Sequence, residues 1–210
     1  MSESEFEKKY VIDVYNVIAK HFDNTRYKPW KSISNFLSSM NSGAIVADIG
    51  CGNGRNMVIR KDCTFYGCDI SIELVKICQK KDLNVIEGSC LNIPFDSNKF
   101  DYTICIAVMG HLSTIERRIK CLDELIRITK PNGLIYIYVW AFEQPSETKK
   151  QFINQDSIVT WNANDGNVYD RYYHLFKKDE IEQLLSQFNV IIKERIEEYG
   201  NYGYIIEKCI

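Results

Sequence analysis

The sequence lacks an excess of either charge, a long apolar run and a paired-cysteine motif. Its 26 basic and 28 acidic side chains give a formal net charge of −2, so bulk charge indicates no nucleic-acid partner, which would need a local basic face. No stretch approaches the roughly 18 apolar residues of a membrane span, and we expect no membrane partner. The acidic start MSESEFEKKY has no basic segment leading into an apolar one, which predicts no secretory signal. These absences favour a cytoplasmic protein, with the nucleus as the other compartment.

Eight cysteines and three histidines are present without the spacing of a metal site. No CxxC pair occurs, so the sequence predicts no metal centre of its own. Most of the cysteines lie in apolar or mixed runs such as YTICIAV and FYGCDI, where a thiol packs as a small hydrophobic side chain. Without a secretory signal we expect a reducing compartment and free thiols.

Strands alternate with helices along most of the chain. Apolar side chains at helical spacing predict one helix from Glu5 to Lys20 and a second around residues 33–37. The other expected elements are strands at 44–50, 64–70, 83–88, 100–108 and 134–141, helices at 71–81, 113–129 and 177–187, and extended runs at 190–196 and 202–210. The order, which begins β-α-β-α-β, predicts one α/β domain with a mostly parallel sheet, helices on both faces and a C-terminal antiparallel hairpin. Residues 143–167 are polar without a clear period, which predicts a long loop of functional importance.

A glycine-rich turn follows the first strand. Gly50, Gly52 and Gly54 can bring bare backbone against a ligand. The spacing is G-x-G-x-G rather than the dinucleotide fingerprint, and Asp48 before it would repel a phosphate but suits a cationic ligand. Asp69 closes the second strand, where a carboxylate can bind both hydroxyls of a ribose. The alternative is that the glycines only tighten the first corner, but the two acids together favour a cofactor site.

These residues, with FDYTICIAV after the third strand, resemble the class I methyltransferases that use S-adenosylmethionine (AdoMet). The resemblance implies a single Rossmann-like domain with a seven-stranded sheet, in which the glycine loop meets the methionine moiety and the acid of the second strand holds the ribose. The implied cofactor residues are Asp48, Gly50, Cys51, Gly52, Gly54, Asp69, Ile70, Ser89, Cys90 and Ile106. Ser89 stands where many members have an aspartate, so a hydroxyl without charge would meet the adenine. The expected parts of the domain, residues 1–210, are an N-terminal helical cap (1–42), a cofactor-binding half (43–140), a substrate-side loop (141–167) and a closing segment (168–210).

Longer stretches are similar to one group, the eukaryotic tRNA wobble-uridine methyltransferases, which includes the methyltransferase domain of an AlkB-like tRNA protein. The stretches are DVYNVIAKHFDNTRYKPW, DIGCGNGR, LNIPF, IAVMGHLSTIERR, YVWAFEQ and RYYHLF. Members esterify the carboxylate of 5-carboxymethyluridine at the anticodon wobble position. The resemblance therefore implies AdoMet as methyl donor, a tRNA anticodon stem-loop as substrate, and a heterodimer with a small zinc-binding activator subunit that holds the zinc.

Five residues in these stretches are candidates for binding the substrate. A carboxylate is already ionised at neutral pH, so its methylation needs positioning by cationic and hydrogen-bonding groups rather than a strong base. Arginine offers a bidentate fork for this purpose. We expect Arg26 and His111 to orient the carboxymethyl group or the wobble nucleotide, and Arg171 and His174 to close from the C-terminal part. Trp140 could stack on a splayed base.

Two of these candidates also have a structural alternative. His111 could be a local hydrogen-bonding residue, Trp140 could belong to the core, and Tyr172 and Tyr173 are expected to be packing residues. The charge pattern of residues 116–118 favours a solvated helix face, whereas the resemblance favours a phosphate contact or a salt bridge. One departure concerns the substrate: Gly110-His111-Leu112 stands where members commonly have two histidines and a tryptophan. The 143–167 segment also looks shorter than in relatives.

Two other hypotheses and one surface complete the sequence-based expectations. The chain could be a small-molecule methyltransferase with the same cofactor half, or a silent scaffold that keeps the fold, and AdoMet binding would separate the scaffold from both enzymes. Scattered basic residues could form an RNA-binding patch, whose affinity would fall steeply with salt. They are Lys28, Lys31, Arg55, Arg60, Lys61, Arg117, Arg118, Lys120, Lys149 and Lys150.

Overall fold

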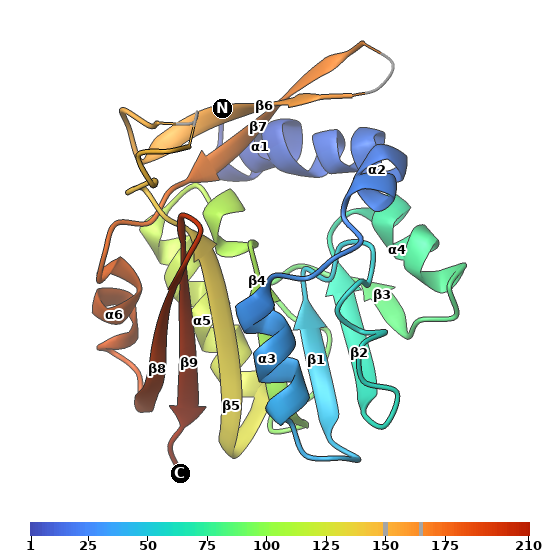
Figure 1. The fold of residues 1–210 in the computed structure, drawn as a ribbon, viewed down its shortest axis with the longest axis vertical. Coiled ribbons are helices and arrows are strands. Elements are labelled where there is room, and N and C mark those ends of the chain that lie inside the picture. The colour runs from blue at the N-terminus through green and yellow to red at the C-terminus, as the bar shows by residue number, and fades with distance from the viewer. Residues whose placement is uncertain (149–150, 164–165) are drawn as a thin grey trace.

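The computed structural model describes residues 1–148, 151–163 and 166–210 (Figure 1). A seven-stranded sheet with strand order β3-β2-β1-β4-β5-β9-β8 forms its centre. The strands are β1 (Ile45–Ile49), β2 (Thr64–Asp69), β3 (Val85–Glu87), β4 (Phe100–Ile106), β5 (Thr129–Trp140), β8 (Val190–Glu198) and β9 (Asn201–Lys208). The first five pair in parallel, and β9 is antiparallel to both β5 and β8. The predicted mostly parallel sheet with a C-terminal antiparallel hairpin is therefore confirmed.

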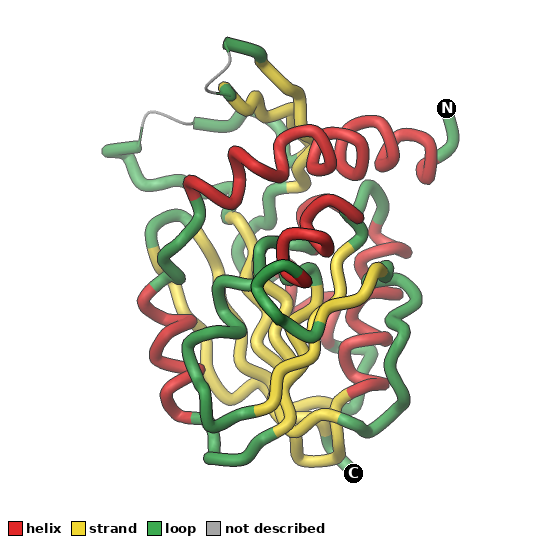
Figure 2. The backbone as a smooth tube through the Cα atoms, turned by 90° about the vertical axis from the view of Figure 1, so that its right-hand side faces the viewer, coloured by secondary structure: helices red, strands yellow, loops and turns green. Residues whose placement is uncertain are grey.

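Helices cover both faces of this sheet (Figure 2). On one face, α5 (Ile115–Ile128) and α6 (Glu180–Leu185) pack against Ile135 and Ile137 of β5. On the other face, α3 (Lys31–Ser39) and α4 (Ile72–Gln79) pack against a core that includes Tyr136 and Tyr138 of the same strand. Successive side chains of a strand point to opposite faces, so one apolar run supplies both cores.

The first crossover contains turns instead of a helix. The expected order placed a helix between β1 and β2, but residues 52–59 form only turns and a bend. Gly52 and Gly54 have φ of 58° and 75°, which is outside the range of a right-handed helix. The Met57 N–H donates to the Gly54 carbonyl at 3.0 Å, which closes a four-residue turn rather than a turn of α-helix. The sequence prediction was wrong here because the ligand-facing loop takes up the space of a helix.

A long helical segment crosses the carboxyl ends of the parallel strands (Figure 1). It consists of α1 (Glu3–Glu7), a π-helical turn (Lys8–Ile12) and α2 (Asp13–Thr25), so it is longer than the helix predicted at 5–20. The buried Glu7 carboxylate accepts hydrogen bonds from the Ser113 N–H and from Arg117 at the start of α5. The segment is thereby fixed over the sheet edge where ligands bind in such folds.

A separate two-stranded sheet lies beyond this helical segment. It pairs β6 (Asp156–Asn162) with β7 (Val168–His174) in antiparallel register. The segment 143–167 was predicted to be a loop, and the presence of β6 within it corrects that prediction. The strand was missed because only Val159 and Trp161 of β6 are buried, which is too few apolar positions for a visible period. Helix α6 is likewise shorter than the predicted helix at 177–187.

No helix in the described ranges is long and apolar enough to cross a membrane. All eight cysteines carry free thiols, and five of them are buried.

Candidate active site

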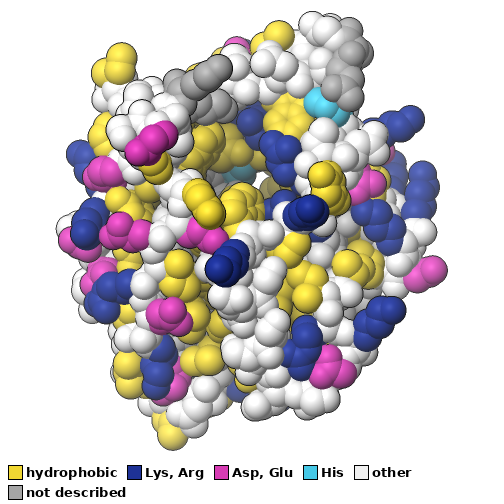
Figure 3. Space-filling model, in the orientation of Figure 1, with side chains coloured by type: hydrophobic (Ala, Val, Ile, Leu, Met, Phe, Trp, Pro, Cys, Tyr) yellow, Lys and Arg dark blue, Asp and Glu magenta, His cyan; other side chains and the backbone are white. Residues whose placement is uncertain are grey.

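A cavity of about 660 Å³ lies between the carboxyl ends of β1, β2 and β4 and the helical segment above them. Figure 3 shows the opening of a hollow near the upper centre of one face, with basic side chains gathered around it. Twelve of the fifteen predicted site residues line the cavity. They are Arg26, Gly50, Cys51, Gly52, Asp69, Ile70, Ser89, Cys90, Ile106, His111, Trp140 and Arg171.

The glycine loop forms the floor of the cavity through backbone groups that a side chain would displace. Gly50 has φ of 68°, and a Cβ there would stand 2.3 Å from Val108 Cγ2. Gly54 lies outside the cavity lining, and a Cβ at its position would stand 2.3 Å from Leu83 Cδ1. The Asp69 carboxylate accepts hydrogen bonds from the Gly52 N–H at 2.8 Å and the Ser71 N–H at 2.9 Å. Asp69 therefore fixes the loop while it faces the cavity.

Buried acceptor atoms without hydrogen-bond partners lie beside the glycine loop. Asp48 is only 1% exposed, and neither of its carboxylate oxygens has a hydrogen-bond partner. Burial raises the pKa of Asp48 to about 7, although the Asn56 side chain and the Arg55 guanidinium offset part of that effect. The Oδ1 atoms of Asn53 and Asn56 are also buried without a donor. Unsatisfied acceptors of this kind favour a cationic ligand group nearby, and Asp48 can act from behind the cavity wall.

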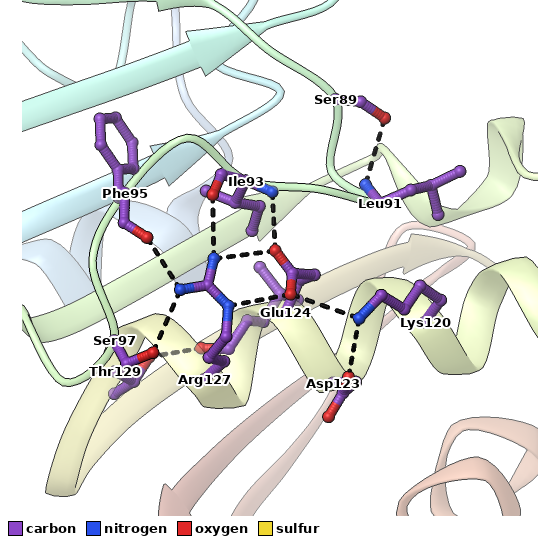
Figure 4. Close-up of polar contacts among 11 residues, drawn as sticks. Ser89, Leu91, Ile93, Phe95, Ser97, Lys120, Asp123, Glu124, Arg127 and Thr129 are labelled. Carbon is purple, nitrogen blue, oxygen red and sulfur yellow. Dashed lines mark hydrogen bonds and ion pairs between the residues drawn. The ribbon is translucent and has the colours of Figure 1, made fainter.

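The opposite end of the cavity is lined by Ile70, Ser89, Cys90 and Leu91. The loop that carries the last three is fixed to α5 by an ion pair (Figure 4). The Glu124 carboxylate accepts from the Ile93 N–H at 2.7 Å, and Arg127 donates to the Ile93 and Phe95 carbonyls at 2.9 and 2.8 Å. This pair thus holds the wall against which the adenine is expected to lie.

We expect the Glu124→Gln variant to lose stability, because Arg127 holds the pKa of the Glu124 carboxyl at about 2 in the folded protein. A carboxylate with a lowered pKa stabilises the fold above its unfolded pKa near 4.5, and this contribution is lost as the pH falls from there toward 2. The variant should unfold about 1–3 kcal/mol more easily at pH 7 and lose less stability than the wild type as the pH is lowered to 3. Urea unfolding at several pH values checks this, with the exposed Asp123 of the same helix, as Asp123→Asn, as the control.

Four side chains form a hydrogen-bonded network on the substrate side of the cavity. The Tyr15 hydroxyl of α2 lies 3.0 Å from His111 Nε2, 3.1 Å from the Tyr173 hydroxyl and 3.3 Å from Arg171 Nη1. Arg171 Nη1 also donates to the Tyr173 hydroxyl at 3.1 Å. Three segments that are far apart in the sequence are therefore joined at one point, which places Arg171 beside His111.

His111 is a neutral acceptor in this network. Its Nδ1 lies 2.9 Å from the Tyr172 carbonyl oxygen, which can only accept, so Nδ1 carries the hydrogen and Nε2 accepts from Tyr15. Desolvation lowers the pKa of His111 to about 4, and the positive charge of Arg171 acts in the same direction. The side chain can orient Tyr15 but carries no charge at neutral pH.

The pH dependence of catalysis should therefore show no inflection from His111 near pH 6.5, the usual histidine pKa. The groups that face its ring are Tyr15, Tyr173 and Arg171, and burial raises the pKa of Tyr173 well above its usual value. We expect the dependence of kcat/KM on pH between 5.5 and 8.5 to have the same shape in the wild type and in His111→Gln, with any break in this range coming from Asp48, whose pKa burial raises to about 7. A break near 6.5 that disappears in His111→Gln would contradict the neutral assignment.

Two arginines stack on one indole ring, that of Trp161. The guanidinium carbons of Arg26 and Arg171 lie 4.8 and 4.7 Å from the Trp161 ring, and Arg55 lies 4.5 Å from the Trp30 ring. In the described part of the chain no carboxylate forms an ion pair with any of the three. Arg171 is only 7% exposed, and its Nε has no partner. Unpaired cations of this kind favour an anionic ligand.

His174 does not reach the cavity. Its Nδ1 lies 2.9 Å from Asp156 Oδ1 and its Nε2 lies 2.7 Å from Glu180 Oε1, so both ring nitrogens are used within the protein. Arg171 and Tyr173 are two residues apart in β7 and share one face, whereas His174 is three residues from Arg171 and lies on the other. The strand period thus separates the two residues that were expected to act together.

Trp140 lines the cavity, with edge contacts to Tyr173 and Phe152 at 5.1 and 5.4 Å between ring centroids. Tyr172 packs away from the cavity and donates to Asp156, as expected for a packing residue. Tyr173 is buried too, but its hydroxyl belongs to the network, so the packing interpretation missed it. Tyr15 and Trp161 were also missed. Arg171 and Tyr173 are two residues apart and so share one face of a strand, which could have indicated Tyr173 as a cavity residue. No such local signal exists for Tyr15 and Trp161, whose positions depend on contacts between distant segments.

The expected basic patch is only partly present. Arg117 forms a salt bridge with Glu7, and Arg118 is 7% exposed and donates to the Leu112 carbonyl, so the solvated-face interpretation of residues 116–118 was wrong for both. Arg60 and Lys120 pair with acidic neighbours. Lys28, Lys31 and Lys61 are exposed, whereas Lys149 and Lys150 lie outside the described residues. Among the described residues, no group of three or more potential ligands could hold a metal ion.

Comparisons with known proteins show the family to which the chain belongs. A methyltransferase-domain family model matches residues 47–137. The tRNA (carboxymethyluridine(34)-5-O)-methyltransferase of Schizosaccharomyces pombe is 35% identical over 228 residues, which cover 98% of this chain and 99% of that protein. The protein called tRNA (carboxymethyluridine(34)-5-O)-methyltransferase alkbh8 of Xenopus tropicalis is 33% identical over 264 residues, which cover 99% of this chain. The chain spans 42% of the length of that protein and 35% of the Arabidopsis thaliana relative.

A solved structure, the complex between the Haloferax volcanii Trm112 methyltransferase activator and a methyltransferase, contains a chain of the same fold. Its TM-score is 0.70 at 16% identity, with 95% of this chain and 96% of that chain covered. Together, the sheet, the glycine loop and the family model define an AdoMet-dependent methyltransferase domain of class I. The relatives narrow the class further. The chain belongs to the family of tRNA (carboxymethyluridine(34)-5-O)-methyltransferases.

Proposed function

We propose that the protein transfers a methyl group from AdoMet to the carboxylate of 5-carboxymethyluridine at the wobble position of a tRNA anticodon. The observation that carries this proposal is the buried Arg171, which has no acidic partner in the described structure and opens onto the same cavity as the glycine loop. An unpaired buried guanidinium needs an anionic ligand, and a carboxylate fits its geometry. The printed names of the relatives supply the identity of that carboxylate.

The residues at the floor of the cavity fit AdoMet. The orphaned oxygens of Asp48, Asn53 and Asn56 suit the ammonium of a methionine moiety, and the Arg55 guanidinium suits its carboxylate. Asp69 faces the cavity in the place expected for a ribose contact, and Ile70, Ser89 and Cys90 line the adenine side. Bare backbone at Gly50 and Gly52 allows close approach of the ligand. When bound there, AdoMet supplies an electrophilic methyl group.

The protein's part in the reaction is to bind and orient. The substrate carboxylate is ionised at neutral pH and needs no general base, which agrees with the neutral state of His111. Arg171 and Arg26 would hold the carboxylate and the adjoining nucleotide in line with the methyl group, and the Trp161 ring fixes the spacing of the two guanidinium groups. Trp140 would stack on the extruded base. The helical segment above the cavity excludes water from the reacting groups.

The test is methyl transfer from labelled AdoMet to tRNA that carries 5-carboxymethyluridine, followed by nucleoside mass analysis. The expected product is the methyl ester. AdoMet binding without ester formation would contradict the tRNA assignment and favour the small-molecule methyltransferase, and absence of AdoMet binding would favour the silent scaffold.

We also propose a heterodimer with a small zinc-binding activator subunit. Strand β3 (Val85–Glu87) is an edge strand, and Ile86 on it is 40% exposed. An open strand edge can pair with another chain. The complex of the Haloferax volcanii relative in fold with Trm112 supports such a partner. Running the methyl-transfer assay with and without the subunit tests this, and we expect the ester only with it. We propose that the heterodimer acts on tRNA in the cytoplasm or in the nucleus.

A further inference from the structure

The Tyr173 side chain belongs both to the hydrogen-bonded network and to the lining of the cavity. Tyr173 belongs to β7, lines the cavity and is 8% exposed. Its ring contacts those of Trp140 and His111, with centroid distances of 5.1 and 4.3 Å. The hydroxyl accepts from Arg171 Nη1 at 3.1 Å and lies 3.1 Å from the Tyr15 hydroxyl. These contacts fix the position of the hydroxyl oxygen but not the direction in which its proton is donated.

The hydrogen bonds around Tyr15 determine the direction in which the Tyr173 hydroxyl donates. His111 Nδ1 donates to the Tyr172 carbonyl, so Nε2 must accept the single proton of Tyr15. In the contact between the two phenols Tyr173 is therefore the donor. Because Arg171 Nη1 also donates to the Tyr15 oxygen at 3.3 Å, that oxygen keeps a partner if Tyr173 turns away. The Tyr173 O–H can rotate about its C–O bond toward the cavity at little cost.

We infer that Tyr173 is a substrate-contacting residue whose hydroxyl turns from Tyr15 to the substrate carboxylate and, with Arg171, selects a free carboxylate over the corresponding primary amide. A hydrogen bond to an anionic oxygen is stronger than one to a neutral phenol, which drives the rotation. Tyr15 and His111 are positioning residues that fix the direction of donation. The inference rests on the proposed function and adds a residue that sets its specificity.

The selectivity arises because the network offers donors and no open acceptor. Arg171 has only N–H groups, the Tyr173 oxygen already accepts from Arg171, and the His111 Nε2 lone pair is occupied by Tyr15. A carboxylate presents two acceptor oxygens to these donors. A primary amide would place an NH₂ group against them, which leaves its donors unsatisfied within the cavity.

The experiment compares the binding of two anticodon stem-loop RNAs, one with 5-carboxymethyluridine and one with the primary amide at the same position. Dissociation constants are measured in the presence of S-adenosylhomocysteine, so no turnover is needed. We expect the full chain with its activator subunit to bind the acid about tenfold more tightly than the amide. Tyr173→Phe should lose most of this ratio through weaker acid binding, with the affinity for S-adenosylhomocysteine unchanged. Tyr172→Phe, the neighbouring residue on the other face of β7, should keep the ratio.

A second variant, Tyr15→Phe, tests the role of the lone pair on His111 Nε2. Tyr15→Phe leaves His111 Nε2 without its donor and gives an amide an acceptor, so the amide should bind more tightly and the ratio should fall. Equal binding of acid and amide by the wild type, or equal weakening of both RNAs in Tyr173→Phe, would overturn the inference. Failure of the proposed function is recognised separately, as discrimination between the RNAs without formation of the methyl ester in the turnover assay.

Discussion

Replacement of Arg171 by alanine is expected to reduce methyl transfer to tRNA on the order of 10²–10³-fold. The guanidinium is the buried, unpaired cation of the substrate side and donates to both Tyr15 and Tyr173. Its loss removes a charged donor for the carboxylate and also one hydrogen-bond partner of each hydroxyl group. Single-turnover rates at saturating AdoMet, with ester quantified by mass, measure the effect.

Arg171→Lys should recover little of this activity, because an ammonium lacks the planar fork that contacts two hydroxyl groups and a carboxylate together. Arg195→Ala serves as the control, since Arg195 is exposed and pairs with Glu182 away from the cavity. AdoMet affinity should change less than twofold in both Arg171 variants. If Arg171→Ala turned over like the control while the ester still formed, Arg171 would not be the carboxylate-binding group.

The second large effect is expected for Asp69→Asn, which should weaken AdoMet binding about 100-fold. The carboxylate accepts the N–H groups of Gly52 and Ser71 and faces the position of the ribose. An amide has one acceptor oxygen, so it can replace only part of this set, and hydrogen bonds to charged groups contribute about 1.5–3 kcal/mol each. Calorimetric titration with AdoMet or S-adenosylhomocysteine gives the affinity.

Stability should respond differently from affinity. Burial raises the pKa of Asp69, which means that the charged form is held at a cost in the folded protein. Replacement by a neutral amide relieves that cost and offsets the lost hydrogen bond, so Asp69→Asn should melt within a few degrees of the wild type. Asp62→Asn, an exposed carboxylate paired with Arg60, is the matched control for affinity. A variant that binds AdoMet like this control would remove Asp69 from the cofactor site.

The parts of the site that sequence reasoning recovered are those coded by adjacent residues. Asp48 near the end of β1 and Gly50 and Gly52 in the turn after it are adjacent in the sequence, and the parallel sheet brings Asp69 from the next strand to the same edge. Secondary-structure periods located every strand of the main sheet for the same reason. Local pattern and local geometry coincide there, so no knowledge of the tertiary structure was required.

The missed features depend on contacts between distant segments. Tyr15 meets His111 across 96 residues and Tyr173 across 158, and no pattern within α2 distinguishes its cavity-facing tyrosine from a packing one. His174 lies away from Arg171 because residues 168–174 form a strand, in which positions 171 and 174 face opposite sides. The helix expected after β1 failed because positive φ at Gly52 and Gly54 serves the ligand loop.

The position of β9 has a consequence for the order in which the chain can fold. This strand comes after β8 in the sequence but lies between β5 and β8 in the sheet. Residues 134–140 of β5 can pair only after residues 201–207 of β9 have been synthesised. During synthesis the edge of β5 therefore stays open until that segment has left the ribosome. Contacts of such sequence separation slow folding. Until β9 is available, one edge of the apolar strand β5 stays unpaired in the growing chain. We therefore expect this strand to need protection from aggregation until β9 pairs with it.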